Sequence, residues 1–158
     1  MTDLFSTSLS EIAADLGRVV CAYLLALPIG LEREHEEHGV GVRTFPLVAM
    51  ASCGFVLLGV TLSHDDPAGR SRIIQGLIAG IGFIGGGAIL KGDGGKGDGA
   101  VHGTATAASI WNMGVMGAAV AQGRYDIGIL LMVLNLFTLK VLAPWKHKLD
   151  TSPQQEKK

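Results

Sequence analysis

Apolar residues gather in five stretches along the chain, separated by short clusters of charged residues, glycine and proline. The second, third and fifth stretches lack the polar stripe at helical spacing that a helix of a soluble bundle would carry. Each stretch is close to the roughly 17 to 25 residues that a helix needs to cross about 30 Å of hydrocarbon. The pattern therefore predicts an all-α, polytopic membrane bundle of about five transmembrane helices within residues 1–143. The expected spans are residues 12–31, 45–62, 73–90, 100–122 and 127–143.

The composition supports this interpretation. Of 158 residues, 48% are apolar and only 17% are charged, whereas a soluble domain carries about 25% charged residues. The net charge of −1 offers no basic footprint for phosphate groups. Cys21 and Cys53 both lie in apolar stretches, where a thiol behaves as a small hydrophobic group. We therefore expect no nucleic-acid partner and no cofactor.

The distribution of Lys and Arg between alternate loops predicts the orientation. Nine of these residues fall on one side of the membrane, after the first and third stretches and at the C-terminal end, and three fall on the other. Because cytoplasmic loops carry the excess of positive charge, we expect a cytoplasmic C-terminus and an N-terminus on the opposite side. Residues 144–158 would then form a short basic cytoplasmic tail.

The third stretch is rich in glycine and contains the GxGxxG spacing of dinucleotide-binding folds. That motif needs a preceding strand and a following amphipathic crossover helix, and neither pattern is present, so we exclude nucleotide binding. Small residues let neighbouring helices approach closely. We expect the third helix to be the packing centre, with the fourth helix as its partner. The predicted packing glycines are Gly76, Gly80 and Gly87 on one face, Gly82, Gly85 and Gly86 on another, and Gly103 and Gly114 in the fourth stretch.

Polar side chains inside the spans are sharper signals of function, because they cost free energy unless they face protein or water. Ser and Thr can return hydrogen bonds to their own helix, which gives most of these residues a structural explanation. Gln75 and Asn112 demand more, because a buried amide needs several partners. Trp111 lies well inside the fourth stretch, and we expect it to pack within the bundle. No Ser/His/Asp or Cys/His set is present in the sequence, so we expect no catalytic activity.

Two loops carry residues that could bind ions. His35 and His38 lie one helical turn apart among carboxylates. Their spacing is not that of the HExxH zinc motif, and solvated charge at a helix end explains it equally well. Residues 91–103 contain six glycines and match neither the Walker phosphate loop nor an EF-hand. We assign no metal site on this basis.

Four strings in matching order resemble the MgtC/SapB family, also called YhiD, of bacterial inner-membrane proteins. The resemblance covers roughly residues 16–142. Longer members of the family add a soluble cytoplasmic domain after the last helix, so the resemblance concerns the membrane domain only. The strings are Gly30–Glu34, Gly41–Thr44, Gln75 with Gly80–Gly87, and Gly103–Trp111.

The resemblance implies a role in growth under magnesium limitation, acid tolerance and intracellular survival, exerted on partner membrane proteins such as the ATP synthase. Our leading hypothesis is a non-enzymatic inner-membrane protein that influences magnesium or proton homeostasis through lateral contacts in the lipid bilayer. The contacts would be made with itself, as a homo-oligomer, or with another membrane protein. The alternative is a small oligomeric channel or transporter for magnesium or another cation, with Gln75, Thr106 and Asn112 lining a polar path.

The candidate functional residues fall into two groups. We expect Arg33 and Arg43 to pair with Glu32 or Glu34 and so lock the first two helices together, or else to bind anionic lipid head groups. The candidates are Glu32, Arg33, Arg43 and Thr44 at the cytoplasmic rim, and Gln75, Thr106 and Trp111 within the bundle.

Overall fold

The computed structural model describes residues 8–34, 40–63, 66–91 and 103–142. These residues form five α-helices and one short π-helical turn, and no strand occurs among them. The all-α fold predicted from the sequence is confirmed. The elements are α1 (Leu9–Glu34), α2 (Thr44–Ser63), α3 (Pro67–Lys91), α4 (Thr104–Ala121), α5 (Tyr125–Phe137) and the π-helical turn η1 (Thr138–Leu142).

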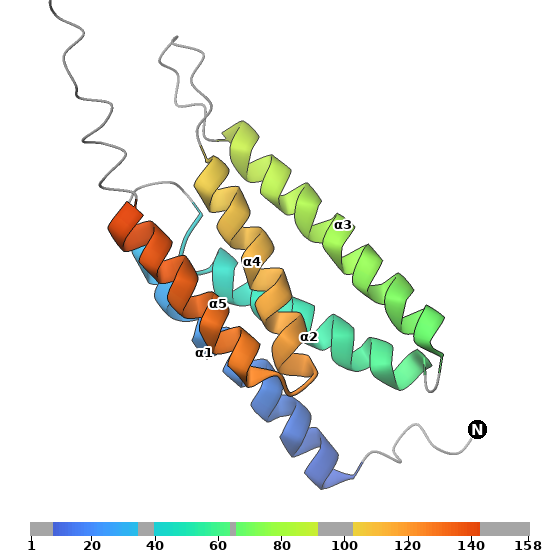
Figure 1. The fold of residues 1–158 in the computed structure, drawn as a ribbon. Helices are drawn as coiled ribbons and strands as arrows, with labels where there is room; N and C mark the ends of the chain where they lie inside the picture. The colour runs from blue at the N-terminus through green and yellow to red at the C-terminus, as the bar shows by residue number, and fades with distance from the viewer. Residues whose placement is uncertain (1–7, 35–39, 64–65, 92–102, 143–158) are drawn as a thin grey trace, which may run out of the picture.

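α4 lies at the centre of the bundle and contacts α1, α2, α3 and α5. Figure 1 shows α4 between α3 on one side and α5 on the other, with α2 crossing behind it. α2 and α3 meet at their short connection and diverge toward their other ends (Figure 1). The largest fully buried side chains of the core come from α1, α2 and α4, and they include Ile29, Phe45, Ile110, Met113 and Met116.

Within the described ranges, four helices are long and apolar enough to cross a membrane: α1, α2, α3, and α5 together with η1. α4 is not among them, because polar and small residues lower its hydropathy. Its central position explains this composition, since a helix surrounded by other helices meets protein more than lipid. With 18 residues, α4 is still about 27 Å long, close to the roughly 30 Å thickness of the hydrocarbon layer.

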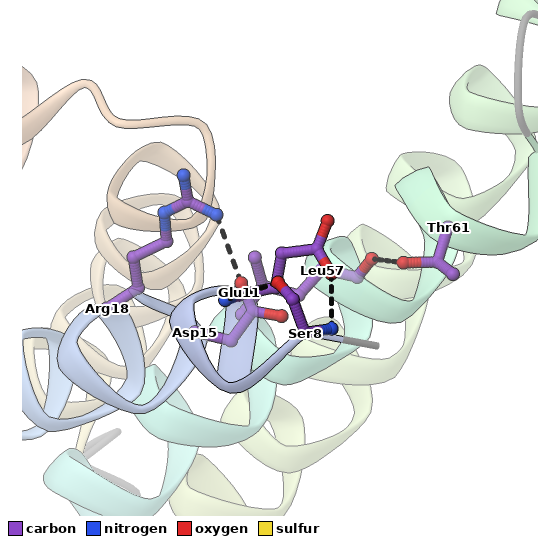
Figure 2. Close-up of polar contacts among 6 residues, drawn as sticks. All are labelled: Ser8, Glu11, Asp15, Arg18, Leu57 and Thr61. Atoms are coloured by element: carbon purple, nitrogen blue, oxygen red, sulfur yellow. Dashed lines mark hydrogen bonds and ion pairs between the residues drawn. The ribbon is translucent and has the colours of Figure 1, made fainter. Parts of the chain in front are cut away.

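α1 begins with a reciprocal capping box. Ser8 Oγ accepts a hydrogen bond from the Glu11 backbone N–H at 3.2 Å, and Glu11 Oε2 accepts one from the Ser8 backbone N–H at 2.8 Å (Figure 2). Further along α1, Arg18 Nη1 lies 3.1 Å from Asp15 Oδ1, which is one turn earlier in the same helix (Figure 2). The charged and polar residues at this end of α1 are therefore satisfied within the helix itself.

α4 ends in a Schellman motif. Gly123 adopts a φ of 73°, the left-handed conformation that glycine enters without a steric penalty. The Arg124 backbone N–H then donates to the carbonyl oxygen of Ala119 at 2.9 Å. The chain can turn sharply at this point, which allows α5 to return alongside α4.

The predicted pairing of the third and fourth helices is confirmed at three glycines. A β-carbon on Gly85 would lie 3.4 Å from a carbonyl oxygen of α4, and one on Gly103 would lie 2.8 Å from a carbonyl oxygen of α3. A β-carbon on Gly114 would collide with an isoleucine side chain of α3. Gly103 has a φ of 82° and precedes α4, so the expected span of residues 100–122 is wrong at this residue.

The prediction that α3 is the packing centre is wrong within this chain, because α4 occupies that position. α3 lies at the edge of the bundle and contacts α2 and α4. Most of its glycines face no neighbour. A β-carbon would have no atom from another element within 4 Å at Gly76, Gly80, Gly82, Gly86 or Gly87.

Candidate functional site

The polar end of α1 is tied to two other parts of the chain by its carboxylates. Glu32 Oε2 lies 3.3 Å from Lys140 Nζ in η1. Glu34 Oε2 accepts a hydrogen bond at 3.0 Å from the backbone N–H of Val42, just before α2. Arg33 lies between these two carboxylates in the sequence and is only 5% exposed. This short charged segment therefore fixes the end of α1 against both η1 and the start of α2.

Arg43 and Thr44 lie where α2 begins. The carbonyl oxygen of Gly41 accepts the Thr44 backbone N–H at 3.0 Å. Any side chain at Gly41 would collide with the Glu34 carboxylate, which explains why glycine occupies this position. Arg43 is exposed and makes no ion pair within the described part of the chain, so its expected pairing with Glu32 or Glu34 is not formed.

A buried hydrogen bond joins α4 to α5. Ser109 Oγ donates to Asn135 Oδ1 at 3.0 Å, and both residues are more than nine-tenths buried. Asn135 Nδ2 is also buried and has no hydrogen-bond partner among the described residues. Thr106, a candidate from the sequence, lies one turn before Ser109 and is 3% exposed. Thr106 is therefore buried one turn away from this contact, which Ser109 and Asn135 form.

Gln75 and Asn112, the two amides singled out in the sequence, lie in different surroundings. Gln75 is on the exposed face of α3, with its Nε2 3.4 Å from Ser71 Oγ. Asn112 Nδ2 donates to the Leu131 carbonyl oxygen of α5 at 3.5 Å. Since Thr106 is buried in the core, these three candidates line no common path within one chain.

Trp111 is 44% exposed, so the prediction that it packs within the bundle is wrong. It lines a cleft of about 410 Å³ between α3 and α4. Arg124 borders the same cleft and pairs with Asp126 at 2.8 Å. The pKa of Arg124 is raised, chiefly because its guanidinium donates hydrogen bonds to Asp126.

A second, larger cleft of about 660 Å³ lies between α2 and α3. Its walls are apolar except for Thr44, at the beginning of α2, and Ser52. Gly76 and Gly80 form part of the α3 wall. Because glycine has no side chain, the α3 wall leaves space unfilled at these two positions, and the cleft is open there.

Several sequence candidates lie outside the described residues. They are His35 and His38, the glycine-rich residues 92–102, and the tail of residues 144–158. Within the described ranges, no group of three or more His, Cys, Asp or Glu side chains could hold a metal ion.

Lys140 is the residue at the polar end that sequence reasoning did not connect to the site. From the sequence alone, it is one of the nine positive charges predicted on the same side of the membrane. The signal was present, because Glu32 and Lys140 both fall at the ends of spans that finish on that side. What the sequence could not show is that α1 and α5 are neighbours.

The outer surface of the bundle is strongly apolar. Soluble monomers rarely expose contiguous apolar surface of this kind. Together with four helices long enough to cross a bilayer, this surface defines a small multi-pass membrane protein. Residues that are more than half exposed include Leu24, Phe55, Leu58, Phe83 and Leu130.

The chain belongs to the MgtC family, whose sequence model matches residues 19–148. The resemblance seen in the four strings is therefore confirmed. The chain is 36% identical over 129 residues to Protein SrpB of Synechococcus elongatus, covering 77% of this chain and 71% of SrpB. It is 33% identical over 133 residues to YhiD of Escherichia coli K12, covering 78% of this chain. It is 31% identical over 143 residues to Protein MgtC of Salmonella typhi, covering 89% of this chain.

The chain spans 58% of the length of YhiD and 58% of the length of the Salmonella typhi protein. No solved structure matches it.

Proposed function

We propose that this chain is a non-enzymatic membrane protein that influences magnesium or proton homeostasis through lateral helix contacts with itself or with another membrane protein. Family membership supports the link to magnesium, since the name of YhiD carries magnesium transport as a suggested activity. The lateral contacts rest on the structure of α3.

The observation that carries the proposal is a row of small residues on the outer face of α3. Ala79, Gly82 and Gly86 follow Gln75 at intervals of four, three and four residues, which places them on one side of a helix. All four are exposed, and no other element of the chain approaches the two glycines within 4 Å of a β-carbon position. Small residues on a lipid-facing helix permit close contact with a second helix.

Gln75 adds a polar group to this row. An amide within a membrane helix costs free energy when it faces lipid, and the described structure offers Gln75 only the nearby Ser71 hydroxyl. A helix from a second chain would bring backbone or side-chain groups to this amide. The row is therefore suited to a protein contact that hydrogen-bonds Gln75 and packs against Ala79, Gly82 and Gly86.

We further propose that the protein lies in the bacterial inner membrane with its N-terminus in the periplasm and its C-terminus in the cytoplasm. Arg33, Arg43 and Lys140 lie at the same end of the bundle, where α1 ends, α2 begins and η1 follows α5. Arg70, Arg72 and Arg124 lie at the opposite end. Counted along the whole sequence, nine Lys and Arg residues fall on the first side and three on the second, and this excess supports the cytoplasmic placement of the first end.

An ion-flux measurement separates this proposal from the channel or transporter alternative. Purified protein in proteoliposomes containing a magnesium-sensitive or a pH-sensitive dye should give no uptake above that of protein-free liposomes, while an added ionophore gives the full signal. The reason is that Gln75, Thr106 and Asn112 do not line a common path in the chain. Uptake that is lost in Gln75→Ala and retained in Gln122→Ala, an exposed glutamine at the end of α4, would contradict the proposal and favour the channel.

A further inference from the structure

The cleft between α2 and α3 has the dimensions of one lipid chain. Its α2 wall runs from Thr44 to Phe55, which is about 16 Å of helix. One leaflet is about half of the roughly 30 Å hydrocarbon layer, so an acyl chain of that leaflet extends over a similar length. The cleft volume of about 660 Å³ falls in the range of roughly 300 to 1,000 Å³ found for small-molecule sites.

The surface of the cleft suits a hydrocarbon chain. Leu47, Phe55, Ile73 and Ile84 line it. The α3 wall is recessed at Gly80, where a β-carbon would have no atom from another element within 4 Å. Recessed glycine between large apolar residues makes a groove into which a flexible chain can settle.

One end of the cleft lies beside two residues of the types that bind phosphate. Thr44 lines the cleft at this end, and the exposed Arg43 precedes it in the chain. Among the described residues, the two carboxylates at this end are already engaged, Glu32 with Lys140 and Glu34 with the Val42 backbone N–H. Arg43 makes no ion pair in the described ranges, and it stands at the start of a helix, where the helix dipole also favours negative charge. Positive charge at the membrane surface attracts anionic lipids.

From this arrangement we infer that the α2–α3 cleft binds one anionic phospholipid of the bilayer. Its acyl chain lies in the cleft, and its phosphate accepts hydrogen bonds from Arg43 and Thr44. This site is distinct from the outer face of α3, because Gly76 and Gly80 line the cleft whereas Gly82 and Gly86 do not. A lipid held there would fill the space between two helices that are joined by a short connection and otherwise diverge.

Native mass spectrometry of the full chain, titrated in detergent with phosphatidylglycerol or phosphatidylcholine, tests the inference. We expect wild-type protein to retain one phosphatidylglycerol at concentrations about tenfold lower than phosphatidylcholine. Arg43→Gln should remove most of this preference, because it loses the charge-assisted hydrogen bonds to phosphate. Arg72→Gln serves as the control, since Arg72 is also exposed but pairs with Asp66 and lies near the start of α3, at the far end of the cleft from Thr44.

Two variants of the cleft wall test the position of the acyl chain. Gly80→Phe and Ala51→Phe place a ring into the cleft from opposite walls, and each should abolish the retained lipid while the protein stays monodisperse. Equal retention of the two lipids by wild-type protein, or equal loss in Arg43→Gln and Arg72→Gln, would overturn the inference. Loss of self-association in Ala51→Phe, with no lipid retained by the wild type, would instead assign the cleft to a second copy of the chain.

Discussion

Gly117→Val should prevent the bundle from forming, and it is the single substitution for which we expect the largest effect. A β-carbon at Gly117 would collide with the carbonyl oxygen of Ala49 and lie 3.0 Å from the β-carbon of Ser52. The obstacle is the backbone of α2, which cannot move aside as a flexible side chain can. Overpacking a core costs about 1–3 kcal/mol and sometimes more, and here it separates α2 from the central helix.

The expected result is loss of the monodisperse peak in fluorescence-detected size-exclusion chromatography of solubilised membranes. Gly54→Val is the matched control, because Gly54 lies in a membrane-spanning helix of the same chain and a β-carbon there would meet no atom within 4 Å. Gly114→Val should fall between them, since the atom it meets is the end of the Ile81 side chain, which can rotate. A normal peak for Gly117→Val would contradict the central position of α4.

Ser109→Ala should destabilise the protein more than the joint replacement of both hydrogen-bond partners. In the single variant, Asn135 keeps a buried amide that has lost its hydrogen bond from Ser109 Oγ. Leaving a buried polar group unsatisfied costs about 1–3 kcal/mol, whereas replacing both partners with apolar groups can be nearly neutral. We therefore expect Ser109→Ala to lower the melting temperature in detergent and Ser109→Ala/Asn135→Leu to restore most of it.

Asn135→Leu alone completes the double-mutant cycle for this pair. Its effect should be small, because the Ser109 hydroxyl can turn to a carbonyl oxygen of its own helix. If Ser109→Ala and Asn135→Leu lower the melting temperature equally and their effects add, the buried hydrogen bond does not couple α4 to α5 as described.

The number and type of the helices follow from the sequence for a direct physical reason. A segment that crosses lipid must be apolar over nearly its whole length and must satisfy its own backbone hydrogen bonds. This constraint made both ends of α2 and the last residue of α3 predictable to within one residue, whereas α3 begins six residues before the expected span, in a polar segment that apolarity does not mark. The constraint applies least to α4, because the composition of this helix reflects contact with other helices. Gly103 was therefore wrongly included in the expected fourth span.

The arrangement of the helices could not be predicted in the same way. A row of glycines shows that a close contact is possible, but it does not show which helix makes the contact or whether that helix belongs to the same chain. For this reason the glycines of α3 suggested a packing centre, whereas α4 occupies it and Gly117 of α4 packs directly against the α2 backbone. The Glu32–Lys140 pair was missed for the same reason, since its partners lie on helices that are distant in sequence.

The central claim, that the outer face of α3 makes lateral contacts with a second chain, is tested most directly by the oligomeric state in native lipid. The protein would be extracted with its surrounding membrane into polymer nanodiscs and the mass of each particle measured. We expect the wild-type chain and Gly17→Leu, a matched substitution on the exposed face of α1, to form oligomers or complexes, and Gly82→Leu to be monomeric. A monomeric wild-type chain without a protein partner, or a Gly82→Leu variant that associates normally, would contradict the claim.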